Sequence, residues 1–453
     1  MIGFSLSQMA REIEARQLGE DVRFASVSTD TRTLRSGDLF VALTGPNFDG
    51  HDYLAQAFQQ GAVAALVQRD TGGDYPRLLV EDTRLALGRM AAVWRQQGDA
   101  RVIAVTGSNG KTTVKEMIAA ILGQKGPVLA TRGNLNNDIG VPLTLLRLQE
   151  ERYAVIELGA NHPGEISYLS KIAMPDIALL NNACRSHLEG FGSIEGVAKA
   201  KSEIVNGLGE SGCFVYNADD NFAPFWGGVA AGRRTLTFGV CQEADVSSQG
   251  DVEVVWDESG FSSRFEVQTP GGEVKVELAL AGEHNRMNAL AAIAAAQEAG
   301  ATLAEIRQGL ARIKPVRGRL QPLPGKGGVM LVDDSYNANP DSVAAAIRVL
   351  ASAPGRRFLL LGELGELGKG TCDFYRELGR EAREAGIDHL YGVAGAAEAA
   401  RCFGDGGAGF EDREQLVDHL RQVLRPGDRV LVKGSRLAAM DRVVDALTDG
   451  ERD

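Results

Sequence analysis

Residues 102–117, VIAVTGSNGKTTVKEM, place a short glycine-containing loop directly between an apolar strand and a helix. In the usual phosphate-binding loop, G-x-x-x-x-G-K-[ST], a glycine would stand at position 105, but this position is Val105 and the loop is two residues shorter. The order of strand, loop and helix start is nevertheless kept, and backbone N–H groups at a helix start converge on anions. We therefore expect a phosphate site here. The alternative is an ordinary turn with an exposed lysine.

The residue types of the loop predict how a nucleotide would be held. Lys111 would reach the outer phosphates, and the hydroxyl of Thr112 would take one position on a magnesium ion. The loop residues expected to bind the nucleotide are Gly107, Ser108, Asn109, Gly110, Lys111, Thr112 and Thr113.

Beyond Arg101 the sequence alternates between strand-like and helical segments, which predicts parallel sheets with helices on both faces. DVEVVW, SSRFEVQ and EVKVELAL, between about 245 and 280, predict an antiparallel addition. Pro315 and the glycine-rich PLPGKGG at 322–328 mark a boundary, after which a second alternating series begins. In the first 83 residues the segments are shorter, and VRFASVSTD at 22–30 is predicted as one strand.

The predicted fold class is therefore α/β with three domains. Residues 1–83 form a small mixed α/β domain, and residues 84–314 form a central parallel-sheet, P-loop ATPase-like domain with the antiparallel addition. Residues 315–453 form a Rossmann-like doubly wound domain. Ligands of such sheets lie beyond the carboxyl ends of the strands, so the two larger domains are expected to face one cleft.

Composition limits the class of protein further. The net charge of −12 argues against non-specific binding to nucleic acid and requires that an anionic substrate meet locally placed Lys or Arg. The five cysteines form no C-x-x-C pair, which favours a reducing cytoplasm and argues against structural zinc. MIGFSLSQMAREIEAR lacks the apolar core of a signal peptide, and no run of 18 apolar residues occurs, so we expect a cytoplasmic protein without membrane insertion.

Three further positions carry side chains suited to phosphate or metal chemistry. Glu157 ends the strand-like segment YAVIELG, where a carboxylate can hold nucleotide-bound magnesium, although a solvated strand-end Glu is the alternative. A lone histidine such as His187 is usually a surface or core residue, and only its neighbours make it a candidate ligand for a second metal. Lys199 and Lys201 are two residues apart on a predicted helix and point to nearly opposite sides, so only one can face a site.

In combination these motifs resemble the Mur ligases, the ATP-dependent enzymes that build the peptide of peptidoglycan. The resemblance rests on TGSNGKTT, Glu157, the N-x-x-x-x-H of Asn182 to His187, Ala200-Lys201 and GEHNRMNALAA at 282–292, and it covers essentially the whole chain. The short phosphate loop is the family's form of the motif. STDTRTLRSGDLFVALTGPNFDGHDYLAQAFQQGA is similar to the uridine-nucleotide domain of the two later-acting ligases, and TRGNLNNDIGVPLTLL and VDDSYNANPDS are similar to segments of the last-acting one.

The resemblance implies roles for individual residues. The implied catalytic residues are Lys111, Lys201, Glu157 and His187, with Thr112, Glu157 and His187 as metal ligands; Lys201, rather than Lys199, is the lysine that becomes a carbamate. ATP would also contact Asn285, Arg319 and Asp334. The implied UDP-sugar and peptide contacts are Ser28, Thr29, Asp30, Arg32, Asp49, Gly50, His51, Asn134, Asn137 and Asp138. The incoming dipeptide would meet Lys433, Ser435 and Arg436, with GELGELG at 362–368 as the other wall.

The implied reaction uses ATP and Mg²⁺ to join D-alanyl-D-alanine to a UDP-N-acetylmuramoyl tripeptide through an acyl phosphate, and the chain is expected to act as a monomer. The alternatives are the tripeptide-forming Mur ligase, a folylpolyglutamate synthase-like ligase, and a nucleotide-binding switch without ligase chemistry. DDSYNANP and the absence of a D-N-P-R motif argue against the first, and the uridine-type domain argues against the second. The sequence leaves open whether the third residue of the tripeptide is diaminopimelate or lysine.

Overall fold

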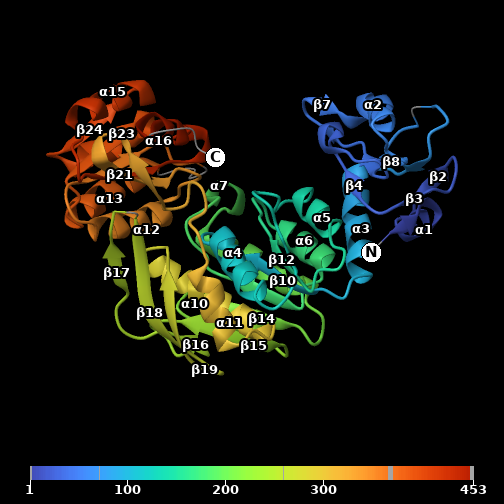
Figure 1. The fold of residues 1–453 in the computed structure, drawn as a ribbon, viewed down its shortest axis with the longest axis horizontal. Helices are drawn as coiled ribbons and strands as arrows, with labels where there is room; N and C mark the ends of the chain where they lie inside the picture. Colours follow the sequence, from blue (N-terminus) through green and yellow to red (C-terminus); the bar gives the residue numbers. More distant parts are fainter. Residues whose placement is uncertain (1–2, 71, 259, 366–370, 449–453) are drawn as a thin grey trace.

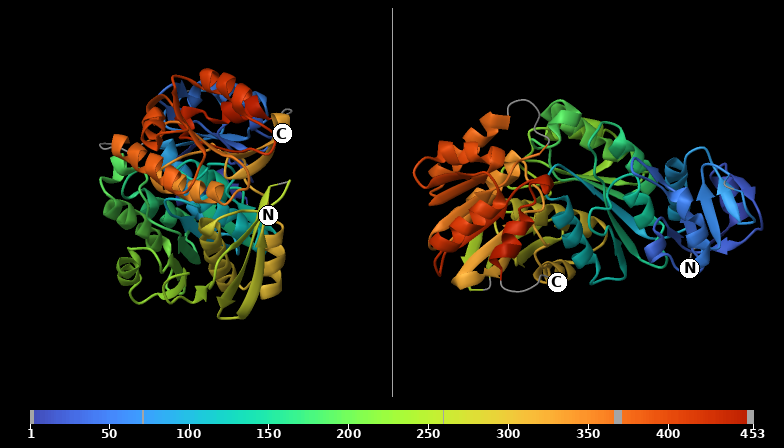
Figure 2. Two further views of the ribbon diagram at one scale, coloured as in Figure 1. Left: turned by 90° about the vertical axis from the view of Figure 1, so that its left-hand side faces the viewer. Right: turned by 90° about the horizontal axis from the view of Figure 1, so that it is seen from above.

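The computed structural model describes residues 3–70, 72–258, 260–365 and 371–448 and arranges them around three main sheets that follow one another along the chain. The amino-terminal sheet lies at one end of the molecule, the central sheet lies in the middle and the carboxyl-terminal sheet lies at the other end (Figures 1 and 2). Among the described helices, none is long and apolar enough to span a lipid bilayer.

The amino-terminal sheet has five short strands in the order β2-β9-β8-β5-β4, with β2 antiparallel to β9 and the other pairs parallel. Two small two-stranded pairings, β1 with β3 and β6 with β7, flank it. The elements are β1 Phe4–Ser5, α1 Leu6–Glu12, β2 Arg16–Leu18, β3 Arg23–Phe24, β4 Val27–Ser28, β5 Leu39–Val41, β6 Thr44–Gly45, β7 Phe48–Asp49, α2 Leu54–Gln59, β8 Ala64–Val67 and β9 Arg77–Leu79.

One expectation for this part of the chain is wrong. Residues 22–30 do not form one strand, because β3 and β4 are separate and pair in different sheets. β3 pairs with β1 at the start of the chain, an element that the sequence pattern did not reveal. A two-residue strand next to a capped helix has too few side chains to display a period.

The central sheet has ten strands, in the order β11-β12-β10-β13-β14-β15-β16-β18-β17, with β19 paired to β18. The pairs from β11 to β16 are parallel, and the pairs that involve β18 are antiparallel, as expected from the sequence. The strands are β10 Arg101–Thr106, β11 Val128–Ala130, β12 Tyr153–Glu157, β13 Ile177–Leu180, β14 Cys213–Asn217, β15 Arg234–Gly239, β16 Val246–Ser247, β17 Glu253–Trp256, β18 Phe261–Thr269 and β19 Gly272–Leu278.

Helices cover both faces of the central sheet. Successive residues of β10 point to opposite faces, so that Val102 and Ala104 join one core while Ile103 and Val105 join the other. The helices are α3 Thr83–Gln96, α4 Lys111–Leu122, α5 Gly140–Leu145, α6 Glu165–Ala173, α7 Leu188–Phe191, α8 Ile194–Ser202, α9 Ala223–Val229, α10 Glu283–Glu298 and α11 Leu303–Ala311. Helices α4, α10 and α11 pack with Ile103 and Val105, and α3, α5, α6 and α8 lie on the other face.

The third sheet has six strands in the order β20-β21-β25-β22-β23-β24. The elements are β20 Gln321–Gly325, β21 Val329–Asp334, α12 Pro340–Ala351, β22 Arg357–Leu361, α13 Thr371–Glu384, β23 His389–Val393, α14 Ala397–Phe403, β24 Gly407–Phe410, α15 Arg413–Val423, β25 Arg429–Lys433 and α16 Asp441–Leu447. The first residues of PLPGKGG are not a linker, because they form β20, antiparallel to β21. Prolines fit there because β20 is an edge strand, on which a missing N–H costs no ladder hydrogen bond.

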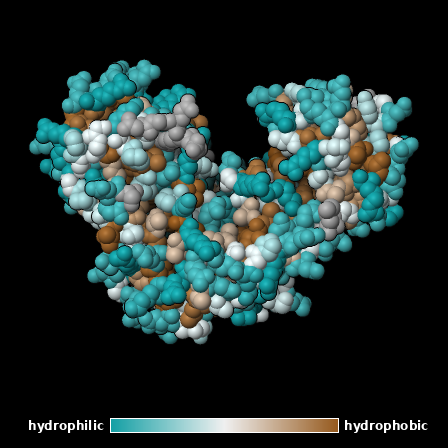
Figure 3. Space-filling model, viewed as in Figure 1, coloured by the Kyte–Doolittle hydropathy of each residue, from teal (hydrophilic) through white to brown (hydrophobic). Residues whose placement is uncertain are grey.

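Helix α3 connects the amino-terminal sheet to the central one. The indole of Trp94 on α3 is fully buried, its Nε1 donates to the carbonyl oxygen of Leu148 at 2.8 Å, and its ring packs against Phe4 and Phe24. At the other side, Trp256 of β17 donates to the hydroxyl of Ser352, just after α12. The space-filling view shows an open hollow between the amino-terminal and carboxyl-terminal parts, above the central sheet (Figure 3).

We expect Trp94→Phe to lower the free energy of unfolding by about 2–4 kcal/mol, because the buried carbonyl of Leu148 loses its donor and space opens beside the ring. Trp256→Phe removes an indole hydrogen bond at a half-buried position and should lower the free energy of unfolding by less than about 1 kcal/mol. Urea unfolding followed by circular dichroism compares the two variants. A loss at Trp256 equal to that at Trp94 would contradict this assignment of the junction.

Candidate functional site

The phosphate loop lies where the strand order of the central sheet reverses. β10 is paired with β12 on one side and β13 on the other, with Val105 opposite Glu157 and Thr106 opposite Leu180. The loop after β10 is therefore flanked by the carboxyl ends of both neighbours, which is the position where open α/β sheets bind ligands.

Two glycines allow this loop to be short. Gly107 has φ +148° and Gly110, which precedes α4, has φ +79°, a left-handed conformation that side chains disfavour. A Cβ atom on Gly110 would lie 2.2 Å from Oδ1 of Asn288 and 2.6 Å from Nδ2 of Asn181. The loop is thus packed directly onto asparagines from α10 and from the end of β13.

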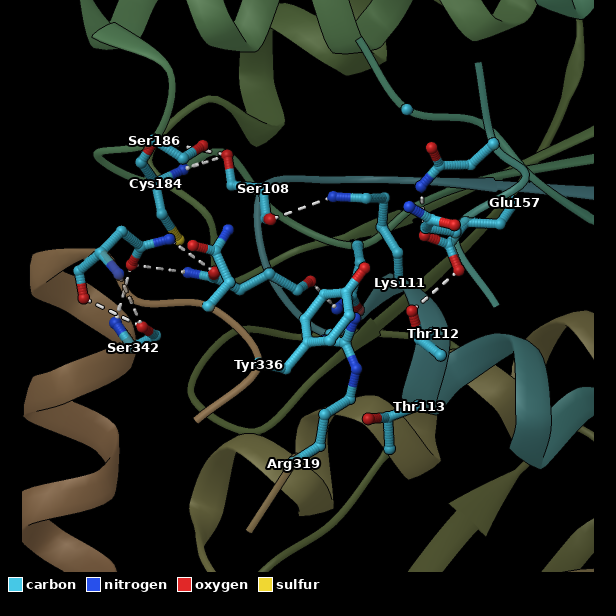
Figure 4. A pocket seen from close by; sticks show the side chains of 18 of the residues that line it. Ser108, Lys111, Thr112, Thr113, Glu157, Cys184, Ser186, Arg319, Tyr336 and Ser342 are labelled. Carbon is cyan, nitrogen blue, oxygen red and sulfur yellow. Dashed lines mark hydrogen bonds between the residues drawn. The ribbon is translucent and has the colours of Figure 1, made fainter. Parts of the chain in front are cut away.

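The two side chains expected to act on phosphate are both placed at the start of α4. Nζ of Lys111 donates to the carbonyl oxygens of Gly107 at 2.7 Å and of Ser108 at 3.1 Å, and burial lowers the pKa of this lysine (Figure 4). The hydroxyl of Thr112 donates to Oε2 of Glu157 at 2.9 Å (Figure 4). Lys111 therefore folds back over its own loop and would exchange these carbonyls for phosphate oxygens.

Glu157 is held from two further sides by residues that the sequence analysis missed. Its carboxylate accepts a hydrogen bond from Nδ2 of Asn136 at 2.8 Å, and its backbone N–H donates to the hydroxyl of Thr131. Lys115, almost fully buried, donates to the carbonyl oxygen of Thr131. Thr131 and Asn136 both lie in TRGNLNNDIGVPLTLL, but that motif does not reveal their contact with Glu157, because the pairing of β11 with β12 brings the segment to β12.

Lys199 and Lys201 differ in solvent exposure, as expected for residues two positions apart on a helix. Lys199 is exposed, whereas Lys201 is 1% exposed, donates to the carbonyl oxygen of Ala160 at 3.2 Å and lies over the ring of Phe191. Burial, reinforced by the charge of Lys111, lowers the pKa of Lys201 to about 7. A large fraction of this lysine is therefore an uncharged amine near neutral pH.

A cavity of about 1150 Å³ gathers most of the residues that the sequence analysis singled out. It lies between the start of α4 and the start of α12 (Figure 4). The predicted residues in its wall are Ser108, Asn109, Gly110, Lys111, Thr112, Thr113, Asn134, Asn137, Asp138, Glu157, His187, Asn285, Arg319, Asp334, Lys433, Ser435 and Arg436. His187 precedes α7 with φ +51°, and Lys201 lies outside the cavity wall, behind Ala160.

The third sheet contributes one wall of this cavity. The guanidinium of Arg319 lies 4.3 Å from the centre of the Tyr336 ring, and the side-chain amides of Asn109 and Asn339 are hydrogen-bonded to each other across the domain junction. Arg185, in the loop before His187, makes ion pairs with Asp341 and Glu377. The phosphate loop and α12 are therefore already in direct contact. Residues 366–368 of GELGELG lie outside the described residues.

Lys433, predicted to face the carboxylate of a dipeptide, also has a partner within the protein. Its Nζ donates to Oδ2 of Asp334 at 2.5 Å and to the carbonyl oxygen of Asn337 at 3.1 Å, and the lysine is only 2% exposed. Burial raises the pKa of Asp334, and the Lys433 ammonium opposes that rise. Asp334 also accepts from the backbone of Leu320, so this pair fixes the entry to the third sheet.

The amino-terminal residues predicted to bind the UDP-sugar lie apart from this cavity. Asp30 accepts from Arg32 and caps a short 3-10 turn, and Ser28 donates to the carbonyl oxygen of Asp30, next to Thr29. Asp49 accepts from Nδ1 of His51 at 2.6 Å and from Arg69, while a Cβ on Gly50 would overlap the backbone of Leu43. None of these predicted amino-terminal residues is in the wall of the described cavity.

The donor set at the loop fits magnesium. Thr112 and Glu157 supply hard oxygen atoms side by side, as Mg²⁺ requires. Among the described residues there is no cluster of three or more His, Cys, Asp or Glu side chains that could hold a metal ion. The protein thus offers few ligands, which suits an ion that keeps water and takes its remaining ligands from phosphate.

Lys433→Met is expected to lower the free energy of unfolding by about 3–5 kcal/mol, because it leaves Asp334 buried without its cation. Adding Asp334→Asn should recover most of that loss. Arg436→Met breaks a comparable but exposed ion pair with Asp441 and should change the free energy of unfolding by less than about 1 kcal/mol. Thermal unfolding of the three variants measures this, and equal effects at Lys433 and Arg436 would refute the structural role.

Comparison with known proteins identifies the family. Residues 23–95 match the description "Mur ligase family, catalytic domain", residues 105–296 match "Mur ligase middle domain" and residues 318–436 match "Mur ligase, glutamate ligase domain". The UDP-N-acetylmuramoyl-tripeptide--D-alanyl-D-alanine ligase of Escherichia coli is 47% identical over 452 residues, which are 99% of each chain.

Solved structures confirm the predicted fold class. A crystal structure of MurF from Acinetobacter baumannii has a TM-score of 0.92 and 36% identity over 98% of each chain. The MurF ligase of Thermotoga maritima in complex with ADP has a TM-score of 0.81 and 31% identity, covering 93% of this chain and 96% of that one. With its phosphate loop, its three sheets and these full-length relatives, the chain belongs to the Mur ligase family.

Proposed function

We propose that the chain is an ATP-dependent ligase that joins D-alanyl-D-alanine to UDP-N-acetylmuramoyl-tripeptide and forms the pentapeptide, ADP and phosphate. The observation that carries this function is the 47% identity, over nearly all of both chains, to a ligase named for these substrates. The loop geometry gives it a physical basis, since a half-buried lysine, a threonine and a glutamate converge at one helix start.

The proposed chemistry has two steps. A carboxylate oxygen of the tripeptide attacks the γ-phosphorus of ATP, the bond to ADP breaks, and an acyl phosphate results. The amine of the dipeptide then attacks the acyl carbon, loses a proton, and phosphate leaves. Phosphoryl transfer depends mainly on positioning and charge neutralisation. We propose that ATP is positioned, and its charge neutralised, by Lys111, the backbone of residues 107–113 and Arg319. Asn285 is proposed to lie near the adenine.

Magnesium, held by Thr112 and Glu157 and with His187 as the proposed ligand of a second ion, neutralises phosphate charge when it is bound. Asn136 and Thr131 keep the Glu157 carboxylate oriented toward Thr112. Lys201 is proposed to react with carbon dioxide: the nitrogen of its neutral amine bonds to the carbon and loses one proton, which gives an anionic carbamate.

The other parts of the chain receive the two substrates. We assign residues 1–83, with Ser28, Thr29, Asp30, Arg32, Asp49, Gly50 and His51, to the UDP-sugar, and Asn134, Asn137 and Asp138 to the sugar and peptide path. Residues 84–314 are proposed to bind ATP, and residues 315–453 to bind the dipeptide through Lys433, Ser435 and Arg436. We also propose that the chain acts as a monomer, in the cytoplasm where ATP is available.

The competing ligases of the same architecture have less support. A folylpolyglutamate synthase and a diaminopimelate-adding ligase resemble this chain at only 18% and 20% identity, which supports a common fold and no more. A nucleotide-binding switch would hydrolyse ATP without needing an amine.

Incubation with ATP, Mg²⁺, UDP-N-acetylmuramoyl tripeptide and D-alanyl-D-alanine should yield the pentapeptide, detected by mass, with phosphate release that requires the dipeptide. Lys111→Met should slow pentapeptide formation at least about a hundredfold, because the transferred phosphoryl group loses its cation. Lys199→Met, which alters an exposed lysine, is the matched control and should retain activity. Phosphate release that is indifferent to the dipeptide would favour the switch.

Carbamylation of Lys201 should depend on pH. Because its pKa is lowered from 10.5 to about 7, the reactive neutral amine prevails above pH 7 and is lost as the pH falls below it. With ¹³C-bicarbonate, the carbon NMR spectrum should show a carbamate signal in the wild type and in Lys199→Met, and none in Lys201→Met. Absence of that signal from the wild type above pH 7 would disprove the modification.

A further inference from the structure

We propose that the ion pair between Arg84 and Asp138 reads the side chain of the tripeptide's third residue and selects diaminopimelate over lysine. This inference rests on the proposed function and concerns the choice between diaminopimelate and lysine, which the sequence left open. Both residues line the cavity that contains the phosphate loop, but they belong to separate elements, α3 and the loop before α5.

Hydrogen bonds to the backbone hold both segments that carry the ion pair. Oδ1 of Asp82 accepts from the backbone N–H groups of Arg84 at 2.7 Å and Leu85 at 3.1 Å, which caps α3. Oδ1 of Asn137 accepts from the N–H of Gly140 at 2.9 Å, which holds the loop that carries Asp138. Nη2 of Arg84 then donates to Oδ1 of Asp138 at 2.7 Å, and its Nε contacts the other carboxylate oxygen.

The pair is open to the cavity and has an apolar neighbour. The side chains of Arg84 and Asp138 are 51% and 35% exposed, so a ligand can reach both charges. Leu85 follows Arg84, lines the same cavity and is 50% exposed. An exposed leucine beside an accessible ion pair matches a substrate side chain with a methylene stem and a charged end.

The position agrees with the path of the peptide. Helix α3 and the loop before α5 lie between the amino-terminal sheet and the phosphate loop (Figure 1). The third residue carries the carboxylate that is phosphorylated at Lys111, so its side chain projects from a point beside the phosphate loop. The wall formed by Arg84, Leu85 and Asp138 is within the same cavity as Lys111.

The charges distinguish the two candidate side chains. Diaminopimelate ends in a carbon that carries both an ammonium and a carboxylate, whereas lysine ends in an ammonium alone. The guanidinium of Arg84 can hold a carboxylate through two parallel hydrogen bonds, while Asp138 accepts from the ammonium. A tripeptide that ends in lysine would place its ammonium at Asp138 and offer Arg84 no carboxylate. The two Asp138 oxygens would then have to accept from both the ammonium and the Arg84 guanidinium.

The test is to measure kcat/KM for two UDP-N-acetylmuramoyl tripeptides, ending in diaminopimelate or in lysine, with D-alanyl-D-alanine as the amine. We expect the wild type to prefer diaminopimelate by at least about tenfold, and Arg84→Met to reduce the preference to less than about threefold, chiefly by raising KM for diaminopimelate. Asp138→Asn should raise KM for both tripeptides, because both present an ammonium. Arg84→Lys keeps the positive charge but cannot form the two parallel hydrogen bonds of a guanidinium, so it should give an intermediate preference.

The matched control is Arg89→Met. Arg89 is on the same helix and pairs with Glu14 at a similarly exposed position, but it is not in the cavity wall, so the preference should stay unchanged. Thermal unfolding of each variant separates misfolding from altered recognition. A wild type without preference, or Arg84 variants that keep it, would overturn the inference while leaving the ligase function intact. Formation of pentapeptide from neither tripeptide would contradict the ligase function itself.

Discussion

The site depends on the insertion of β10 between β12 and β13. This pairing brings three strand ends together, so that the phosphate loop, Glu157 and the segment that begins with Asn181 meet at one edge of the sheet. The short loop is packed onto asparagine side chains, which leave no room for a Cβ at Gly110 and little at Gly107.

Burial of charge explains why this site suits an anion although the protein is negatively charged overall. Lys111 is half-buried and Lys201 is fully buried, and loss of solvent lowers the pKa of each. A bound triphosphate would favour the protonated form of Lys111 and replace the carbonyl groups that it now contacts. Lys433, in contrast, is already balanced by Asp334 and contributes little free positive charge. Lys111 and Arg319, which both line the cavity, are therefore the cations proposed to meet the phosphates.

The sequence predicted most of the sheet architecture, because parallel strands that are buried on both faces leave long apolar runs such as VIAV. It also separated Lys199 from Lys201, because a helix turns residues two positions apart to different sides. It did not predict β20 from a proline-rich segment, nor β3 as the partner of β1, because edge strands and two-residue strands carry almost no pattern. Asn136, Thr131 and the pairing of Lys433 with Asp334 depend on contacts across strands, which local spacing does not encode.

The central claim is that the phosphoryl group passes from ATP to the carboxylate of the tripeptide. Labelling the terminal carboxylate of the tripeptide with ¹⁸O and measuring the isotope in the released phosphate tests it directly. The account predicts that each phosphate carries one oxygen from that carboxylate, because the bridging oxygen of the acyl phosphate leaves with phosphorus when the amine attacks. Phosphate released without the label, while the pentapeptide forms, would contradict it.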